Sequence, residues 1–561
     1  MRFTVKTFST LFNRGDYAAA DRACREELAV NPSNDYAWHY RGVVAIHLKE
    51  FERAVQYFLR TIFHAPGRVD SHVNLGIALR ALGRWDEAIG ALTKAVKLDP
   101  TNFEGLLMLA STHLVRREYA EADCVASKAL ELRPQAAEAW DVVAMSARRL
   151  SNFYRAADAA NKAIAGNPSL PDSHQVLADV ATREGDYERA ERHYLSALAL
   201  NPESSEVRSN FGLLLNRMGR LEESAEQYRR ALDGSPGDAQ LRYGLAIALL
   251  AQGHFEDGWT HYGARAEAHR VARLPGLPTL DRLPTEGERI AVTTDQGPGE
   301  QIMFASLLPD LSRTGAILTL TCDARLVELM RRSFPALQVQ GRSEPLGTND
   351  FQIGLADAAR WLRPAFESFP RYNGYLKADP FMTDVLRARY AGERDGQLVV
   401  GISWRTIEEA KVSSQKSIAL NRWGSILPQP GVTFVCLQYG ECESEIRAVQ
   451  DSLGVRVIND RAVDALLDLD SLAAQIAAMD LVITTSNTTA HLAGALNVPT
   501  WVFVPAGFGA FWHWFLGRSD SPWYPSVRLF RQAQRGDWRV PLEEVSTALA
   551  AMVKSHSRAA S

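Results

Sequence analysis

Three loops in the C-terminal half of the chain carry residues whose types and spacing could hold an anionic ligand. The first contains Gly297 and Gly299, whose lack of a side chain lets the backbone approach a ligand closely, and then Glu300. From the start of the following helix, Glu300 would point into the site. A glycine-rich turn whose acid complements the helix dipole is the alternative, so this loop by itself is a weak signal.

The second loop combines a hydroxyl group with two cations. Ser403 and Arg405 end an apolar run, and Lys416 follows after a polar segment. At the end of one strand, these three side chains could clamp a phosphate or a diphosphate. A solvated basic loop is the alternative.

The third loop gives the strongest signal. A buried run ends in Ser486, Asn487, Thr488 and Thr489, and an alanine- and glycine-rich helix that contains His491 follows. Free backbone N–H groups at a helix N-terminus, together with hydroxyl donors, form an anion site. Close packing by small residues explains the helix but not the four polar residues before it, so a phosphate site is favoured.

Short β-rich runs that alternate with helices must position these loops. We expect strands at 290–294, 316–322, 351–355, 398–404, 432–437, 455–458, 481–484 and 501–504. Strand–helix alternation predicts parallel, doubly wound sheets whose ligands bind at the carboxyl ends of the strands. A break near residues 378–397 divides the strands into two Rossmann-like lobes, for which we expect residues 289–394 and 395–556.

The N-terminal half has a 34-residue period. Prolines recur at that spacing, at Pro32, Pro66, Pro100, Pro134, Pro168, Pro202 and Pro236, and small residues recur at fixed distances before them. This pattern resembles the tetratricopeptide repeat, a pair of antiparallel helices with small residues where they cross and a proline after the second. The resemblance predicts an α-solenoid over residues 1–272 that binds another polypeptide on its concave surface, and a proline-rich linker at 273–288.

One position in each repeat is expected to lie on the floor of that concave surface. It holds Tyr40, Asn74, Met108, Val142, Val176 and Asn210. The repeats resemble those of the eukaryotic O-GlcNAc transferase, in which an asparagine ladder at this position holds the backbone of the guest polypeptide. Because most of the ladder is replaced here, the groove is partly apolar, and we expect it to hold an amphipathic helix better than an extended strand. The alternative is that some of these side chains pack between helices.

Taken together, the three loops resemble those of GT-B glycosyltransferases of the heptosyltransferase-like group, from about Arg289 to Trp538. In that family the first loop reads Gly-Leu-Gly-Asp, and the match implies that Glu300 is the base that deprotonates the acceptor hydroxyl. The third loop of the family commonly reads Asp-Thr ahead of the histidine, where this chain has Ser486 and Asn487. The resemblance implies donor contacts at Gly297, Gly299, Ser403, Arg405, Lys416, Gln438, Ser486, Asn487, Thr488, Thr489 and His491.

This two-part layout implies a protein O-glycosyltransferase that moves a sugar from a nucleotide-sugar to a serine or threonine. It would invert the anomeric centre and need neither a metal nor a cofactor. Bacterial flagellin glycosyltransferases are the closest fit in layout, which implies flagellin as the acceptor and a CMP-linked nonulosonic acid as the donor. An anionic donor suits a loop that lacks the family's aspartate, because like charges repel. The alternatives are a non-catalytic repeat scaffold with a degenerate GT-B domain and a lipopolysaccharide-type heptosyltransferase.

The composition argues against several other classes. The 561 residues include 62 Lys and Arg against 66 Asp and Glu, a formal charge of −4, which does not favour a nucleic-acid binder. Five cysteines without a CxxC pair fit a reducing compartment without structural zinc. The N-terminus lacks signal-peptide features, and the uncharged stretch between Asp480 and Arg518 is interrupted by polar residues and prolines. We therefore expect a cytoplasmic protein without membrane insertion.

Overall fold

The computed structural model describes residues 4–560 apart from 270, 272, 370, 372, 392–396, 407–414 and 508–510, with side chains up to residue 556. Contacts divide the chain into two compact units, Met1–Val207 and Arg208–Ser561. This division falls inside the repeat array, so the last repeat helices are compact with the α/β region. Two boundaries expected from the sequence, at residue 272 and between 394 and 395, lie outside the described residues.

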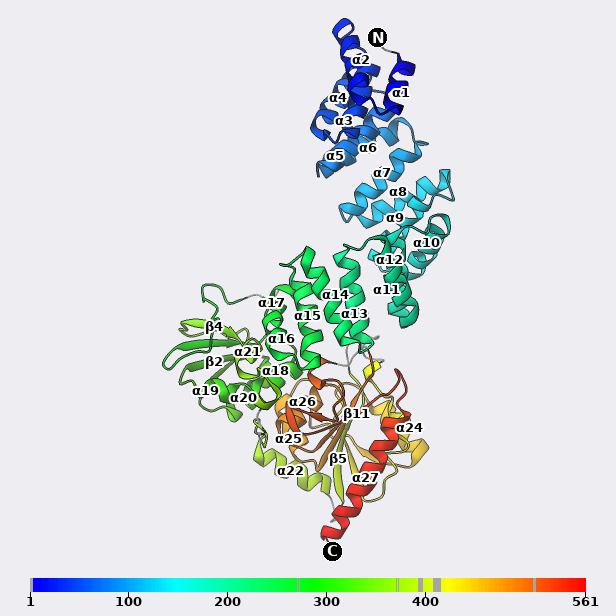
Figure 1. Ribbon diagram of the computed structural model, residues 1–561. Helices are drawn as coiled ribbons and strands as arrows, with labels where there is room; N and C mark the ends of the chain where they lie inside the picture. The colour runs from blue at the N-terminus through cyan, green and yellow to red at the C-terminus, as the bar shows by residue number, and fades with distance from the viewer. Residues whose placement is uncertain are drawn as a thin grey trace. The chain divides into compact units, whose positions relative to one another are not determined.

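The first unit consists of helices that pair in an antiparallel manner in chain order (Figure 1). They are α1 (Val5–Asn13), α2 (Tyr17–Val30), α3 (Asp35–His47), α4 (Phe51–His64), α5 (Val69–Ala81), α6 (Trp85–Leu98), α7 (Phe103–Val115), α8 (Tyr119–Leu132), α9 (Ala137–Arg149), α10 (Phe153–Gly166), α11 (Pro171–Glu184) and α12 (Tyr187–Leu200), with α13 (Ser205–Arg217) across the unit boundary. Small residues lie where paired helices cross: a methyl group on Gly42 would lie 2.5 Å from the Phe58 ring. The predicted helix pairs are confirmed.

The second unit begins with the last repeat helices, α14 (Leu221–Gly234), α15 (Ala239–Gln252), α16 (Phe255–Tyr262) and the short α17 (Arg265–Ala268). The proline-rich segment that follows packs along a sheet edge. The N–H of Leu280 donates to the carbonyl of Gln352 at 2.8 Å, and the N–H of Gln352 donates to the carbonyl of Pro278 at 2.9 Å. The segment expected to be a linker is therefore part of a folded body.

The first sheet has four parallel strands in the order β3-β2-β1-β4. The strands are β1 (Arg289–Thr293), β2 (Ile317–Cys322), β3 (Gln338–Gly341) and β4 (Phe351–Gly354), and the helices between and after them are α18 (Pro298–Ala305), α19 (Leu308–Ser312), α20 (Val327–Ser333) and α21 (Ala359–Leu362), with turns η1 (Ala324–Leu326) and η2 (Phe366–Ser368). The short edge strand β3 was not expected from the sequence. The loop that carries Gly297 leaves the carboxyl end of the central strand β1.

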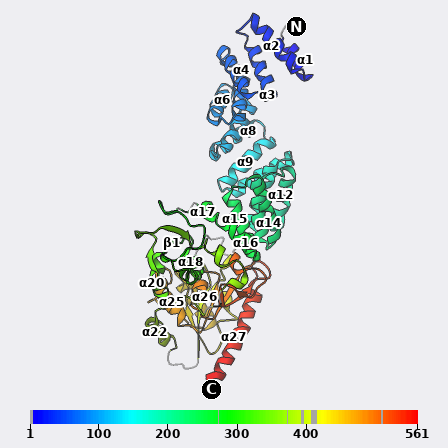
Figure 2. The ribbon, with the colours of Figure 1, turned by 60° about the vertical axis from the view of Figure 1, so that its left-hand side comes forward.

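The second sheet has seven strands in the order β10-β11-β9-β8-β5-β6-β7, and all but β10 run parallel. The strands are β5 (Leu398–Ser403), β6 (Val432–Cys436), β7 (Val457–Ile458), β8 (Leu481–Thr485), β9 (Thr500–Val504), β10 (Asp520–Ser521) and β11 (Tyr524–Arg531), and the other elements are α22 (Pro380–Ala391), η3 (Leu420–Trp423), α24 (Glu443–Leu453), α25 (Leu469–Ala477), α26 (Thr488–Ala495), η4 (Trp512–Trp514) and α27 (Arg539–Ala560). Helices α26 and α27 cover opposite faces of this sheet (Figures 1 and 2). The predicted parallel sheets are confirmed, whereas β10 and β11 were not expected.

One hydrophobic core joins the last repeat helices to both sheets. Phe255 and Trp259 of α16 belong to the same buried cluster as Val292 of β1 and Val482 of β8. The indole N–H of Trp259 also donates to the backbone carbonyl of Arg363 at 2.8 Å. This cluster therefore holds the first sheet, one face of the second sheet and these helices together, and a second cluster lies between the other face of the second sheet and α27.

Candidate functional site

The first and third loops meet at the N-termini of two helices, α18 and α26. A methyl group on Gly299 would lie 3.0 Å from Cδ2 of His491 and 3.6 Å from Oγ1 of Thr488, whereas one on Gly297 would meet no atom within 4 Å. The sequence predicted that the backbone of this loop lies close to a ligand. At Gly299 the group that approaches is the His491 ring, and this contact joins the two sheets at the carboxyl ends of their strands.

Glu300 is half-buried in the first turn of α18. Its carboxylate adds to the effect of burial in raising the pKa of Tyr243 on α15 to about 12, and it also raises the pKa of Tyr262 on α16. The other acid of this loop, Asp295, is ion-paired with the buried Arg265 at 2.8 Å. The side chain proposed as a base therefore lies beside the last repeat helices.

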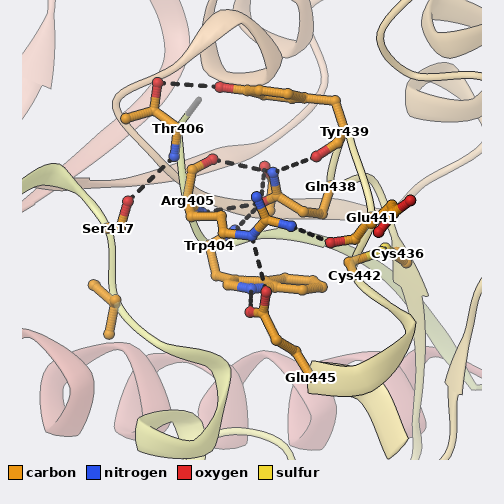
Figure 3. A network of polar contacts seen from close by, with 12 residues as sticks. Trp404, Arg405, Thr406, Ser417, Cys436, Gln438, Tyr439, Glu441, Cys442 and Glu445 are labelled. Atoms are coloured by element: carbon orange, nitrogen blue, oxygen red, sulfur yellow. Dashed lines mark hydrogen bonds and ion pairs between the residues drawn. The ribbon is translucent and has the colours of Figure 1, made fainter. Parts of the chain in front are cut away.

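Three side chains predicted to contact a donor are hydrogen-bonded to each other, and Figure 3 shows the part of this network around Gln438. Oε1 of Gln438 accepts the backbone N–H groups of Trp404 at 3.0 Å and Arg405 at 2.9 Å. Ser403 donates its hydroxyl to the same oxygen at 3.2 Å and accepts a hydrogen bond from the Asn487 amide at 2.9 Å. Ser403, Gln438 and Asn487 thus fix the ends of β5, β6 and β8 relative to one another.

Arg405 is directed toward α24 (Figure 3). Its Nε donates to Glu445 at 2.9 Å, and its guanidinium also donates to the carbonyl of Glu441. The indole N–H of Trp404 donates to the same Glu445 carboxylate. The guanidinium that was expected to clamp a phosphate is therefore engaged by a carboxylate and a carbonyl.

Lys416 and His491 lie together in a buried, aromatic environment. The Lys416 ammonium is 3.7 Å from the centroid of the Phe511 ring, and only 1% of the residue is exposed. Nδ1 of His491 lies 2.8 Å from the Tyr524 hydroxyl, and the ring stacks on Trp514 at 5.3 Å. Burial, and then the charge of Lys416, lower the pKa of His491 to about 3, so this imidazole is neutral.

A second histidine at this place was missed by sequence reasoning. His513 on η4 is 1% exposed, and its ring centroid lies 4.9 Å from that of His491. Neither of its ring nitrogens has a hydrogen-bond partner within the described residues, and the same is true of Oγ1 of the buried Thr489. Ser486 accepts a hydrogen bond from the Trp514 indole at 2.8 Å. The run of aromatic residues from 511 to 515 was given no role in the sequence analysis, and no distinct signal in the sequence marked His513.

A pocket of about 800 Å³ opens at the carboxyl ends of β6 and β7. Its wall includes Gln438, Tyr439, Cys442, Arg447 and Asn459. Pockets of 300–1,000 Å³ accommodate ligands of nucleotide size. Sγ of Cys442, which lines the pocket, lies 3.6 Å from Sγ of Cys436, and both thiols are free.

The six predicted groove residues differ in exposure. Val142 and Val176 are buried between helices, as the alternative interpretation expected, whereas Tyr40, Asn74, Met108 and Asn210 are half-buried. Tyr40 stacks on Phe8 at 4.3 Å. The residues of this set that lie in the first unit therefore form no uniform apolar floor.

Two features are absent from the described residues. Among them, no group of three or more His, Cys, Asp or Glu side chains is arranged to hold a metal ion. None of the helices that can be described combines the length and the apolar character that a membrane crossing requires.

Comparisons with known proteins agree with the repeat array. Models of the tetratricopeptide repeat match residues 6–69, 69–102, 176–239 and 209–270. The chain is similar to "Protein FlbA" of Caulobacter vibrioides, with 34% identity over 316 residues that cover 52% of each chain, and to anaphase-promoting complex subunit 6 of Arabidopsis thaliana, with 32% identity over 18% of this chain and 20% of that one. It thus spans about half of the first relative and a fifth of the second.

Among solved structures, the Cut9–Hcn1 assembly of the anaphase-promoting complex has a TM-score of 0.38 at 17% identity, covering 47% of this chain and 52% of that one. A tetratricopeptide-repeat protein of Thermus thermophilus has a TM-score of 0.28 at 29% identity, covering 32% of this chain and 99% of that one. The matches to the repeat models, between residues 6 and 270, show that the N-terminal part of the chain carries tetratricopeptide repeats, and a mixed α/β region with parallel sheets follows it.

Proposed function

We propose that the chain is a protein O-glycosyltransferase whose α/β region has the GT-B arrangement. The observation that carries this proposal is the contact between Gly299 and His491. It brings an acid at the start of α18 and a polar helix N-terminus, that of α26, to the carboxyl ends of two parallel sheets. Ligands of open α/β sheets bind at such ends, and helix N-termini favour anions.

In the proposed reaction, the phosphate of a nucleotide-sugar binds at the N-terminus of α26. The ammonium of Lys416 and the first-turn N–H groups stabilise the negative charge that develops on the leaving group. The pocket beside Gln438 and Tyr439 has the size for the nucleoside. Glu300 takes the proton from the acceptor hydroxyl as that oxygen attacks the anomeric carbon from the opposite face. No metal and no cofactor take part in this scheme.

We infer that the acceptor is a polypeptide held by the repeats, with flagellin and cytoplasmic modification as the specific case that the GT-B resemblance suggests. A CMP-linked nonulosonic acid is the corresponding donor. The third loop supports an anionic donor, because Ser486 and Asn487 are uncharged and no carboxylate of this pair would repel the donor beside α26.

The test uses the full chain with purified flagellin and CMP-linked nonulosonic acids, and measures the intact mass of the acceptor. Glu300→Gln is expected to lower kcat about 100-fold or more, because general-base catalysis contributes about that much, and to leave the KM for the donor unchanged. Glu328→Gln, on the exposed surface of α20, is the matched control and should retain the wild-type rate. Transfer by Glu300→Gln at the wild-type rate would remove Glu300 from the mechanism.

A non-catalytic scaffold is the second candidate, and one observation favours it. Ser403, Gln438 and Asn487 bond to one another and Arg405 pairs with Glu445, so these four predicted donor contacts already have partners. Calorimetry of the full chain with CMP, UDP and ADP separates the two candidates. Binding of any of the three contradicts the scaffold, and binding of none contradicts the transferase.

A further inference from the structure

His513 is a buried polar side chain whose hydrogen-bonding groups have no partner among the described residues. Its ring stacks on Phe511 at 5.2 Å and meets Trp514 at 5.0 Å, and 1% of the residue is exposed. An imidazole that is removed from water without a hydrogen bond destabilises the fold. Native structures hold few such groups, and each of them calls for a specific cause, such as strain, a catalytic role, or a bound water or ion.

The position of His513 indicates which ligand could meet it. The turn η4 packs on the loop before α26, where the Trp514 indole donates to Ser486 at 2.8 Å. The His491 ring, 4.9 Å away, lies in the first turn of α26 beside Gly299. His513 therefore borders the same helix N-terminus that the proposed reaction uses for the phosphate.

The charges around His513 favour an anion. Burial lowers the pKa of His513 well below its usual value, and His491 and Lys416 lower it further, so the ring is neutral. Arg531 of β11 donates to the carbonyls of Trp514 and Phe515 at the other side of the turn. A neutral imidazole has one N–H to donate. Its hydrogen bond is strongest to an oxygen that carries negative charge, and the nearby cation and helix N-terminus also favour such an oxygen.

We propose that His513 is a binding residue of this site and that it donates a ring N–H to a phosphate oxygen of the nucleotide. The inference rests on the proposed function and adds to it a residue outside the three loops. The bound phosphate would supply a hydrogen bond to a side chain that has no partner among the described residues. His513 therefore disfavours the free state and favours the bound state, and these two effects are separable by experiment.

The experiment compares His513→Phe with the wild-type full chain. Phenylalanine fills the same space among Phe511, Trp512 and Trp514 without a polar group, so the Tm of the free protein is expected to rise by about 1–3 °C. The affinity for CMP and for UDP, measured by calorimetry, is expected to fall about 10-fold or more. His513→Gln, which keeps an N–H donor, should recover part of that affinity.

His39→Phe in α3 is the matched control, because His39 is also buried but is hydrogen-bonded to Ser71 at 2.7 Å. This variant is expected to lower the Tm and to leave nucleotide affinity unchanged. A His513→Phe protein that binds CMP and UDP as tightly as the wild type, or that fails to fold, overturns the inference alone. A wild-type chain that binds neither nucleotide overturns the proposed function and the inference with it.

Discussion

Buried apolar side chains form several small clusters in the first unit, each shared by neighbouring helices, whereas one cluster in the second unit extends from Leu221 to Leu529. In the repeat unit a helix is therefore stabilised mainly by the helices next to it in sequence. In the second unit a helix such as α16 depends on strands that lie far from it along the chain. The same helix-pair motif is thus stabilised by neighbouring helices in one unit and by distant strands in the other.

The difference explains why the 34-residue period did not locate the boundary between the two units. The period continues through α15, where Ala246 occupies the expected small position, although the contacts divide the chain at Val207. Phe255, Trp259 and Tyr262 lie within the solenoid that was expected over residues 1–272. In the structure they are core residues of the α/β region, so a fragment that ends at residue 272 would expose them to water.

The largest effect is expected from Trp259→Ala. Trp259 is 3% exposed, and its removal leaves a cavity in the shared core and an unpaired Arg363 carbonyl. Loss of a large core side chain lowers the free energy of unfolding by about 3–5 kcal/mol. Calorimetric unfolding should show this loss in the transition of the second unit, with activity and nucleotide binding lost at the same temperature.

Trp140→Ala is the matched control for that change. Trp140 also lies on a repeat helix, α9, and also donates its indole N–H to a backbone carbonyl, that of Pro134 at 2.8 Å. It is only half-buried, so the expected loss is about 1–2 kcal/mol and is confined to the first unit. Equal losses for the two tryptophans, or a loss in both units from either one, would contradict the distinction between the units.

An intermediate effect of opposite sign is expected from Asp141→Asn in α9. Burial raises the pKa of Asp141 from its ordinary value of 3.8 to about 6, despite a hydrogen bond from Ser173 at 2.5 Å. The folded state therefore binds the proton more tightly than the unfolded state, and wild-type stability falls as the pH rises from about 4 through 6. Asparagine keeps the hydrogen bond and carries no charge, so it should stabilise the first unit above pH 6, by on the order of 2 kcal/mol.

The measurement is thermal unfolding at pH 4 and pH 8, because the gain from Asp141→Asn should vanish at the lower pH. Asp158→Asn, at an exposed ion pair with Lys162, is the control and should change stability by less than about 1 kcal/mol at either pH. A gain that is independent of pH would assign the effect to something other than ionisation of Asp141.

The sequence could predict the elements of the candidate site but not how its side chains are used. Strand–helix alternation correctly placed Ser403, Gln438 and Asn487 at strand ends, because parallel strands bring their carboxyl ends to one edge. Whether their polar atoms face a ligand or each other depends on distances between segments that are 35 to 84 residues apart. Periodicity contains no information about such distances.

His513 is a residue of the candidate site that the sequence did not indicate at all. A histidine between tryptophans resembles core in any pattern of hydrophobicity, and only the three-dimensional structure shows that its nitrogens lack partners in the described part of the chain. By contrast, the repeat helices were predictable because their packing is local and the spacing of prolines and small residues encodes it directly.

The smallest effect, and the sharpest comparison, is expected from replacing one glycine in each unit by alanine. A methyl group on Gly299 would lie 3.0 Å from the His491 ring, which is fixed by Tyr524 and by its stack on Trp514. A methyl group on Gly76 would lie even closer, 2.5 Å, to Leu92. Distance alone therefore predicts the larger loss at Gly76.

We expect the reverse, because alanine gains more helix propensity in the interior of α5, at Gly76, than in the first turn of α18, at Gly299. The atom that the methyl group on Gly76 would overlap is Cγ of Leu92, and Leu92 is 0% exposed, so relief of the overlap moves a packed side chain. The alanine gains about 1 kcal/mol of helix propensity in α5, which offsets part of this loss, so Gly76→Ala should destabilise the first unit by less than about 1 kcal/mol. His491 cannot shift without breaking its contact with Tyr524, so Gly299→Ala should destabilise the second unit by about 1–2 kcal/mol and lower CMP affinity. If Gly76→Ala proves the more damaging, the repeat unit is as rigidly packed as the α/β unit, and the contrast between local and shared cores does not hold.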